Sequence, residues 1–166
     1  LIAAINDPNP VLFFDHNALY RSISGQVPEE YYEVEIGKAK HVKEGQDISI
    51  ITYGAGVHWA IEYAEKNKKI SVDIVDLRSL LPLDYDALQQ AVSRTGKILV
   101  LHEDTLTGGI GGEIAAWISE HCFDKLDAPV MRCASLDTPI PFNLDLEKNF
   151  MAYSRLGQKI EQLMSY

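Results

Sequence analysis

From Ile36 onward, short apolar runs alternate with stretches in which apolar residues recur every three or four positions. The runs have the length of buried strands, and the stretches have the single apolar face of amphipathic helices. The runs lie at residues 48–53, 72–75, 98–101 and 130–133. Repetition of strand and helix at this spacing predicts right-handed βαβ units, and hence an α/β fold with a mainly parallel sheet and helices on both faces.

Four helices are expected from their apolar faces. The faces consist of Val57, Ala60, Ile61 and Ala64 in the first helix, Leu88, Ala91 and Val92 in the second, Ile114, Ala115, Ile118 and Cys122 in the third, and Tyr153, Leu156, Ile160 and Leu163 in the last. Asp84 is expected to cap the start of the second helix, and Gly96 to end it at the usual C′ position. The strand over 98–101 is the most apolar, which favours a central place in the sheet.

An edge hairpin is expected ahead of the first of these strands. The segment KAKHV, residues 38–42, and the run that begins at Asp47 flank the turn KEGQ. Two such arms around a short polar turn predict a hairpin. Lysines in its first arm suit an antiparallel strand at the edge of the sheet, where charged side chains discourage further pairing.

Residues 1–36 lack this rhythm. The opening LIAAIND can be the end of a helix, the following prolines enforce a break, and VLFF at 11–14 is expected to be a short buried strand. The polar stretch at 24–35 is typical of a linker. The chain begins at Leu1, within an apolar, helix-like phrase, as expected of a piece of a longer protein.

Composition and charge limit the kinds of partner and the cellular compartment that are expected. A chain of 166 residues, 46% of them hydrophobic, is long enough for one domain with a substantial core. A net charge of −9 argues against nucleic acid and anionic membranes and favours a basic partner surface. Cys122 and Cys133 form no CxxC motif, which fits a reducing compartment such as the cytoplasm. No stretch approaches a membrane span or a signal peptide.

The phrase TGGIGGEI after the most apolar strand raises the question of a phosphate site. A dinucleotide fingerprint requires G-x-G-x-x-G, but Gly109 and Gly111 are followed by Ile114 where a third glycine is needed. No Gly-Lys-Ser/Thr sequence for a P-loop is present. Gly108, Gly109, Gly111 and Gly112 are therefore expected to let the helix start pack tightly against neighbouring backbone or another subunit.

Other candidate residues follow the strands. His102, Glu103 and Asp104 end the most apolar strand, but consecutive strand residues point to alternate faces and cannot converge on one metal ion. Structural or interfacial hydrogen bonding is favoured for them. His58, in the second glycine turn YGAGVH, is expected to be a partly exposed or hydrogen-bonded residue at a helix start.

A further pair of charges lies after the second core strand. Asp76 and Arg78 flank Leu77 and are therefore expected to share a face and form an ion pair within a loop.

Five phrases together resemble one family: DPNPVLFFDHNALYR, VDLRSLLPLD, TGKILVLHEDTLTGGIGGEIAAWI, LDAPVMRCASLDTPIPF and IEQLMSY. The family is the β subunit, or β half, of the thiamine-diphosphate-dependent decarboxylating component of 2-oxo acid dehydrogenase complexes. The resemblance implies that residues 37–166 are a transketolase-like C-terminal domain, and that residues 1–36 are the tail of a preceding pyrimidine-binding domain plus a linker.

The resemblance also bears on the cofactor. In the family, thiamine diphosphate and magnesium lie between the pyrimidine-binding domain and the partner half, which carries a Gly-Asp-Gly metal motif. Neither that motif nor the family's catalytic residues lie in this stretch, so no catalytic, cofactor-binding or metal residue is expected here. This chain alone is expected to be inactive and to bind no cofactor.

HEDTLTGG, HCFDKLDAP and the terminal tyrosine look closer to branched-chain (2-oxoisovalerate) dehydrogenases than to pyruvate dehydrogenases. The resemblance implies decarboxylation of the 2-oxo acid and acylation of lipoyl groups by the parent. It further implies three partners: the catalytic α half or subunit, a second β half, and the dihydrolipoyl acyltransferase core through its subunit-binding domain. Tyr166, Gly108, Gly109, Gly111 and Gly112 are the expected interface residues.

Three alternatives stay open. The chain could derive from a pyruvate dehydrogenase β subunit, or it could be an interaction module without an enzymatic parent. A free-standing, flavodoxin-like or nucleotide-binding α/β protein would place its ligand at the carboxyl ends of the strands, near Gly54, Arg78 and Glu103. The compartment is expected to be a bacterial cytoplasm, with the mitochondrial matrix as the alternative.

Overall fold

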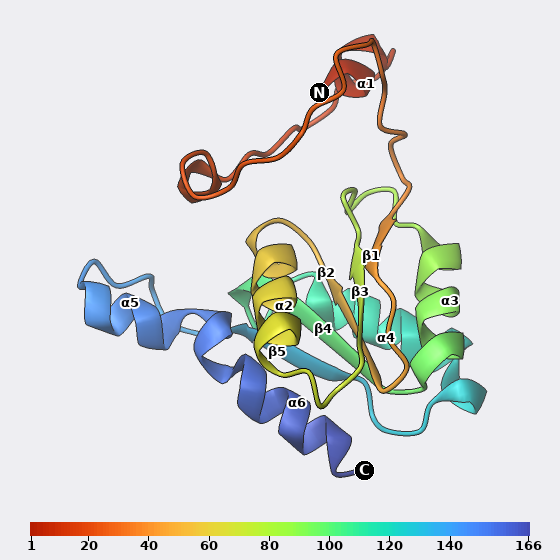
Figure 1. Cartoon of the computed structure of the whole chain (residues 1–166), viewed down its shortest axis with the longest axis vertical. Coiled ribbons are helices and arrows are strands. Elements are labelled where there is room, and N and C mark those ends of the chain that lie inside the picture. The colour runs from red at the N-terminus through yellow and green to blue at the C-terminus, as the bar shows by residue number, and fades with distance from the viewer.

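A computed structural model describes residues 1–166 and contains one five-stranded sheet (Figure 1). The strands are β1 (Lys40–Lys43), β2 (Ile48–Thr52), β3 (Val72–Asp76), β4 (Ile98–Thr105) and β5 (Met131–Ser135). The helices are α1 (Ile2–Asn6), α2 (Ala55–Lys66), α3 (Tyr85–Thr95), α4 (Gly111–His121), α5 (Leu144–Phe150) and α6 (Leu156–Met164). Short 3₁₀ turns are η1 (Asn17–Leu19), η2 (Phe123–Lys125) and η3 (Ala152–Arg155). Among the helices, α5 was not expected from the sequence.

The strand order in the sheet is β1-β3-β2-β4-β5. Strands β2 to β5 run parallel, while β1 pairs antiparallel with β3 at one edge. The α/β fold with a mainly parallel sheet and one antiparallel edge strand is therefore confirmed. Strand β4 lies between β2 and β5, inside the sheet as expected, although the middle strand of the five is β2.

The expected hairpin between β1 and β2 is wrong, because β3 lies between them. The connecting residues pass close beside the start of β3. The amides of Gln46 and Asp47 donate to the carbonyl oxygen of Ser71 at 3.1 and 2.9 Å. A Cβ on Gly45 would lie 2.1 Å from the carbonyl carbon of Val72. Direct pairing of β1 with β2 was expected because the two strands are close in sequence. The connection between them instead passes the start of β3, and β3 pairs with both strands.

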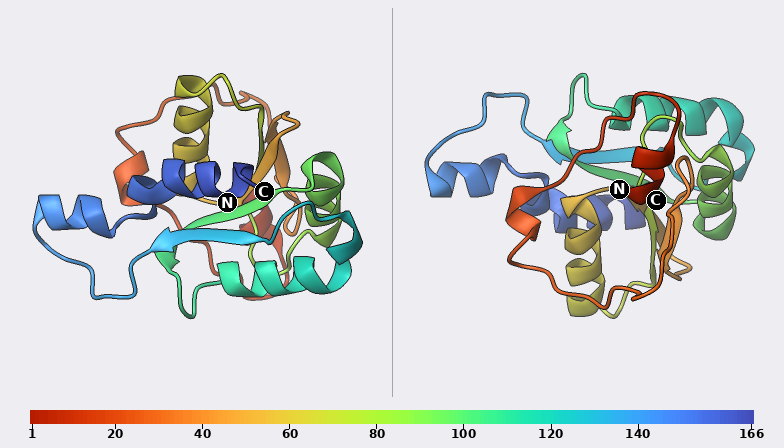
Figure 2. Two further views of the ribbon diagram at one scale, coloured as in Figure 1. Left: turned by 90° about the horizontal axis from the view of Figure 1, so that it is seen from below. Right: turned by 90° about the horizontal axis from the view of Figure 1, so that it is seen from above.

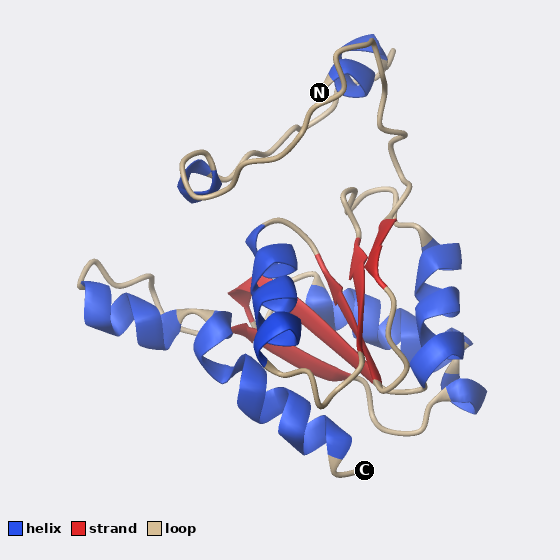
Figure 3. Cartoon of the chain, in the orientation of Figure 1, coloured by secondary structure: helices blue, strands red, loops and turns tan.

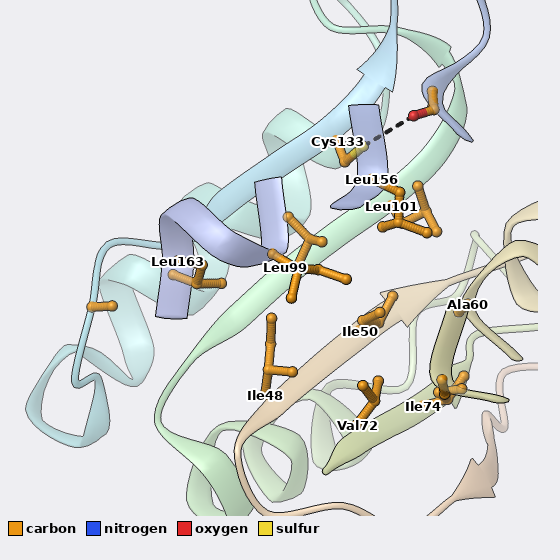
Figure 4. Close-up of a cluster of buried hydrophobic side chains, with 14 residues drawn as sticks. Ile48, Ile50, Ala60, Val72, Ile74, Leu99, Leu101, Cys133, Leu156 and Leu163 are labelled. Atoms are coloured by element: carbon orange, nitrogen blue, oxygen red, sulfur yellow. Dashed lines mark hydrogen bonds between the residues drawn. The ribbon is translucent and has the colours of Figure 1, made fainter. Parts of the chain in front are cut away.

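Helices cover both faces of the sheet (Figure 2). On one face, α2 and α6 pack on the strands, and on the other α3 and α4 do. Side chains of β4 alternate between these layers, so that Leu99 and Leu101 join the first core and Ile98 and Val100 the second. Figure 4 shows Leu156 of α6 beside Leu101, in the first core. Both faces of β4 are consequently removed from water, the usual state of a parallel strand.

The expected helix faces are largely confirmed. All the named residues are buried except Ile61 and Ala115, which are half-buried, and Tyr153, which is 43% exposed. Tyr153 lies in η3 rather than in α6, and its hydroxyl donates to Glu62 at 3.2 Å. Asp84 caps α3 by accepting from the amide of Ala87, and Gly96 ends it with φ of 63°.

The N-terminal segment has little regular structure (Figure 3). The expected helix end is present as α1, but residues 11–14 form no strand, and Leu12 and Phe14 are 84% and 86% exposed. The predicted buried strand is therefore wrong for this chain, because these apolar side chains have no neighbour here to pack against. Residues 24–35 contain no helix or strand.

A buried carboxylate fastens the edge strand to the rest of the domain. Asp73 of β3 is fully buried and accepts hydrogen bonds from Arg94 of α3, at 3.0 Å for both guanidinium nitrogens, and from Ser49 of β2 at 2.8 Å. His41 of β1 also pairs with it. Because a buried charge must be paired to be tolerated, this cluster fixes β1 and α3 against the sheet.

Leu101→Ala should lower the free energy of unfolding by about 2–5 kcal/mol, because the side chain is fully buried and its removal leaves a cavity. Chemical denaturation followed by circular dichroism measures this. Leu12→Ala is the control, since Leu12 is 84% exposed and should change stability by about 0.5 kcal/mol or less. A cost near zero at Leu101 would place β4 outside the core.

Candidate functional site

The candidate site lies where β4 ends and α4 begins. β4 extends to Thr105, so His102, Glu103 and Asp104 belong to the strand rather than to the turn after it. Residues 106–112, called the glycine-rich loop below, comprise the turn after β4 and the first two residues of α4. This loop stands at the carboxyl edge of the sheet, the edge at which the parallel strands end. Open α/β sheets commonly bind ligands there.

The imidazole of His102 lies directly beneath the glycine-rich loop. The residue is fully buried. A Cβ on Gly111 would lie 2.2 Å from Nε2 of His102, and a Cβ on Gly109 would lie 2.7 Å from Cε1 and 2.4 Å from the carbonyl oxygen of Thr105. Neither position has room for a side chain. Gly109 and Gly111 therefore allow close packing of the helix start within the chain, against His102 and Thr105.

The other two glycines of the loop have different surroundings. Gly108 is exposed, has a φ of 79°, which only glycine adopts easily, and has no atom near its Cβ position. A Cβ on Gly112 would lie 3.4 Å from Nη1 of Arg132, the flexible end of a long side chain. Of the four glycines, only Gly108 and Gly112 are accessible to another molecule.

Burial keeps the imidazole of His102 neutral. Removal from water disfavours the charged form and lowers the pKa of His102, and the nearby charge of Arg132 lowers it further, against the opposing effect of Asp104. Neither ring nitrogen has a hydrogen-bond partner within the chain. No group of three or more His, Cys, Asp or Glu side chains is placed to hold a metal ion.

Unlike His102, Glu103 has a side-chain partner, and it points to the other face of the strand, as alternation requires. Its carboxylate pairs with Nε2 of His16, at 3.0 and 3.2 Å for the two oxygens. This contact joins the N-terminal segment to β4 within the chain. Asp104 accepts from the amide of Thr105 at 2.7 Å. Burial raises the pKa of Tyr53, and the charges of Asp104 and Glu103 raise it further.

The glycine-rich loop is held by polar contacts to β5 and the residues after it. Asp137 accepts from the amide and hydroxyl of Thr107 at 2.8 and 2.6 Å. These hydrogen bonds lower the pKa of Asp137. Nη1 of Arg132 donates to the carbonyl oxygen of Leu106 at 2.9 Å. The amide and hydroxyl of Thr107, which an anion could use, are thus already engaged by a carboxylate of the chain.

The expected ion pair between Asp76 and Arg78 is wrong. The backbone amide of Arg78, and not its guanidinium, donates to Oδ1 of Asp76 at 3.0 Å. Arg78 has a φ of 58°, in the left-handed region, so the alternation on which the prediction rested ends at Leu77. Burial raises the pKa of Asp76.

Tyr166 and the glycine-rich loop lie at opposite ends of the domain (Figure 1). Helix α6 starts beside Leu101 and ends beyond Leu99, so it returns the chain toward the starts of the strands (Figure 4). Tyr166 follows it and is 63% exposed. The expected interface residues therefore do not form one surface. His58 is half-buried in α2, and Gly54 is exposed ahead of that helix.

Two of the cavities of the domain lie away from the glycine-rich loop. The larger, of about 460 Å³, is lined by polar and charged residues of α3 together with Lys125. The smaller, of about 230 Å³, lies between α3 and the start of β1. Ligand pockets are mostly apolar with a few polar groups, and neither cavity has that character. No helix has the length and apolar composition needed to cross a membrane.

The fold and the site define a doubly wound α/β domain whose glycine-rich loop packs a helix onto an interior strand. The family described as "Transketolase, C-terminal domain" matches residues 37–154, and the chain belongs to this family. The expected resemblance to it is confirmed.

Known relatives are β subunits of 2-oxo acid dehydrogenases. The chain is 50% identical over 154 residues to the 2-oxoisovalerate dehydrogenase subunit beta of Bacillus subtilis, covering 91% of this chain and 47% of the relative. It is 45% identical over 145 residues to the pyruvate dehydrogenase E1 component subunit beta of the same organism, covering 86% and 45%. The chain thus spans about half the length of these relatives.

A solved structure described as "Split gene transketolase, inactive beta4 tetramer" has the same fold. It superposes with a TM-score of 0.68 at 25% identity, covering 84% of this chain and 46% of that chain.

Several residues of the site were missed by sequence reasoning. His16, Arg132 and Asp137 each contact a residue far away in sequence, and no local spacing marks such a pair. The sequence also did not predict that both ring nitrogens of His102 lack a hydrogen-bond partner. It indicated only that this residue ends an apolar strand.

Gly111→Ala should destabilise the domain by about 1–3 kcal/mol, because the added methyl meets the buried ring of His102 and forces α4 outward. Gly112→Ala is the matched control in the same helical turn, since only the mobile end of Arg132 lies nearby. Thermal denaturation of the two variants measures the difference. Equal stability of both would mean that α4 does not approach His102 closely.

Proposed function

We propose that this chain is the C-terminal assembly and dimerisation domain of a 2-oxo acid dehydrogenase decarboxylating component. The parent would decarboxylate a 2-oxo acid on thiamine diphosphate and transfer the acyl group to lipoyl groups. The observation that carries the proposal is the enclosure of His102 by Gly109 and Gly111. It makes the glycine-rich loop a packing device, in keeping with a domain that assembles rather than catalyses.

The proposal divides the chain at residue 36. Residues 37–166 form the transketolase-like domain, and the family match over 37–154 supports that start. Residues 1–36 are the tail of a preceding pyrimidine-binding domain and a linker. Their exposed apolar side chains, and the lack of helix and strand over 24–35, support this division.

For the substrate we propose a branched-chain 2-oxo acid of the 2-oxoisovalerate type. The higher identity to a 2-oxoisovalerate dehydrogenase β subunit, 50% against 45%, supports it. The phrases HEDTLTGG and HCFDKLDAP support it as well. A pyruvate dehydrogenase β subunit is the alternative. Assay of the parent with both 2-oxo acids distinguishes them, since a preference for pyruvate would reject the branched-chain assignment.

The cofactor of the parent, thiamine diphosphate with magnesium, does not fit the residues of this chain. A diphosphate at the glycine-rich loop would meet the carboxylate of Asp137, which already accepts from Thr107. Glu103 and Asp104 add negative charge nearby. Like charges at this range repel. We therefore derive no chemical step on this chain and assign cofactor binding to other parts of the parent.

The proposed partners are the catalytic α half or subunit, a second β half, and the dihydrolipoyl acyltransferase core. A net charge of −9 suits basic partner surfaces and speeds encounter at low salt. The structural neighbour named a β4 tetramer is an assembly of β chains, which supports contact between two copies. The proposed compartment is the bacterial cytoplasm, with the mitochondrial matrix as the alternative.

Isothermal calorimetry of this chain with thiamine diphosphate and magnesium should give no heat of binding, because the carboxylate of Asp137 occupies the donors of Thr107 and repels a diphosphate at the loop. The same titration of the assembled parent is the control and should show binding. Micromolar affinity for this chain alone would reveal a cofactor site. It would reject the proposal that the cofactor binds only to other parts of the parent.

Deleting Tyr166 from the parent should weaken binding of the acyltransferase subunit-binding domain without changing decarboxylation of the free 2-oxo acid. Tyr166 is 63% exposed, so its aromatic ring and hydroxyl are accessible to a partner. Binding is measured at low and at physiological salt. Phe123→Ala, at an aromatic residue that is 77% exposed, serves as control. Unchanged binding without Tyr166 would exclude this role.

A further inference from the structure

We infer that the cavity of about 230 Å³ between α3 and the start of β1 binds a small aliphatic α-amino acid in its zwitterionic form. This space is called the α3–β1 cavity below. The inference goes beyond the proposed function and does not depend on it, because it rests only on residues of this chain. It assigns a ligand to a part of the domain that the proposed function leaves unused.

The two walls of the α3–β1 cavity are attached to each other at both ends of α3 (Figure 1). Ahead of the first turn of α3, Oδ2 of Asp84 accepts from the amide of Ala39 at 3.0 Å. In the last turn, Arg94 binds Asp73 of β3, which also pairs with His41 of β1. Residues of both attachments line the cavity. The space between the walls is therefore fixed, and a ligand meets a site that needs no ordering.

Two side chains of opposite charge at the α3–β1 cavity have no charged partner in the chain. Lys38, just before β1, and Asp86, in the first turn of α3, both line the cavity. The ion pairs of the chain include neither residue. The ammonium group of Lys38 can therefore pair with a carboxylate of a ligand, and the carboxylate of Asp86 can pair with an ammonium group.

The guanidinium of Arg94 adds a second group that can hold a carboxylate. Its Nε and Nη2 donate to the two oxygens of Asp73 at 3.0 Å each, which fixes the plane of the guanidinium and balances the charge of Asp73. These bonds leave Nη1 of Arg94 without an acceptor in the chain. Guanidinium and ammonium groups both form strong, charge-assisted hydrogen bonds to carboxylates. Arg94 and Lys38 together are therefore suited to the carboxylate of an amino acid.

The size and the apolar residues of the α3–β1 cavity indicate the side chain of the ligand. Ala39, Val75 and Ala87 are the apolar residues that line it. They offer a short aliphatic side chain a small surface on which to leave water. A volume of about 230 Å³ equals that of about eight water molecules at about 30 Å³ each. This is comparable with the bulk of valine, which is therefore the ligand chosen for the test.

Other classes of ligand fit these residues less well. A simple anion would meet the carboxylates of Asp84 and Asp86, and a simple cation would meet Lys38 and Arg94, and like charges repel. A metal ion is not favoured, because no group of three or more His, Cys, Asp or Glu side chains is placed to hold one. A large apolar ligand needs a mostly apolar pocket. A small zwitterion is the class that matches both signs of charge.

Isothermal calorimetry of the full-length parent with three probes tests the inference. Valine should bind with a dissociation constant of about 1 mM or lower. Isovalerate lacks the ammonium group of valine, and isobutylamine lacks its carboxylate. Each should bind at least about tenfold more weakly than valine, because each leaves one charged side of the cavity without its partner.

Variants of the parent locate the binding at the α3–β1 cavity rather than elsewhere in the protein. Asp86→Asn and Lys38→Gln should each weaken valine binding by about tenfold or more. Glu113→Gln is the matched control for Asp86→Asn, since Glu113 is an exposed carboxylate in the first turn of α4. Lys43→Gln is the control for Lys38→Gln, because Lys43 is exposed in β1 and does not line the cavity. Both controls should bind valine like the unchanged parent.

Four results would overturn the inference. The first is no heat of binding with valine, and the second is equal binding of valine and isovalerate, which would mean a simple anion site. The third is equal binding of valine and isobutylamine, which would mean a simple cation site. The fourth is valine binding that Asp86→Asn and Lys38→Gln leave unchanged, which would place the amino acid at another part of the parent.

Discussion

Both faces of β4 are buried, and this requires a helix layer to come close on each side. Leu99 and Leu101 meet α6, which has aliphatic side chains and adjusts easily. On the other side the imidazole of His102 limits the approach, and α4 reaches it only because Gly109 and Gly111 carry no side chain. This contact sets the position of α4 and of the loop before it, and thereby the place at which Thr107 can meet Asp137.

Much of the fold follows from short-range signals in the sequence. Buried strands show as apolar runs, and α3 was marked by its cap Asp84 and its final Gly96. The ion pair expected between Asp76 and Arg78 failed for a local reason, the left-handed backbone of Arg78. The other two errors depend on a distant part of the chain. The hairpin failed because β3, far along the chain, pairs with β1. The run at 11–14 is apolar enough for a core, but burial depends on a neighbour that this chain does not supply.

The site was predictable to a lesser extent. The glycines match neither a dinucleotide fingerprint nor a P-loop, and this correctly predicted a packing role. The spacing did not identify His102 as the residue that Gly109 and Gly111 cover. His16 and Glu103 are 87 residues apart, and Thr107 and Asp137 are 30 apart. Such pairs form only once the sheet brings their strands together. The consequence for function is that, at the carboxyl edge where related folds hold ligands, polar groups of the chain such as Glu103 and Asp137 are paired with its own side chains.

The central claim is that the glycine-rich loop encloses a neutral imidazole rather than a ligand. Titration of His102 by NMR, with its signal assigned from a His102→Gln variant, tests this most directly. The account predicts a pKa for His102 below the ordinary value of 6.5, because burial disfavours the charged ring. A pKa for His102 at or above 6.5 would mean that water or an anion reaches the ring, and would contradict the account.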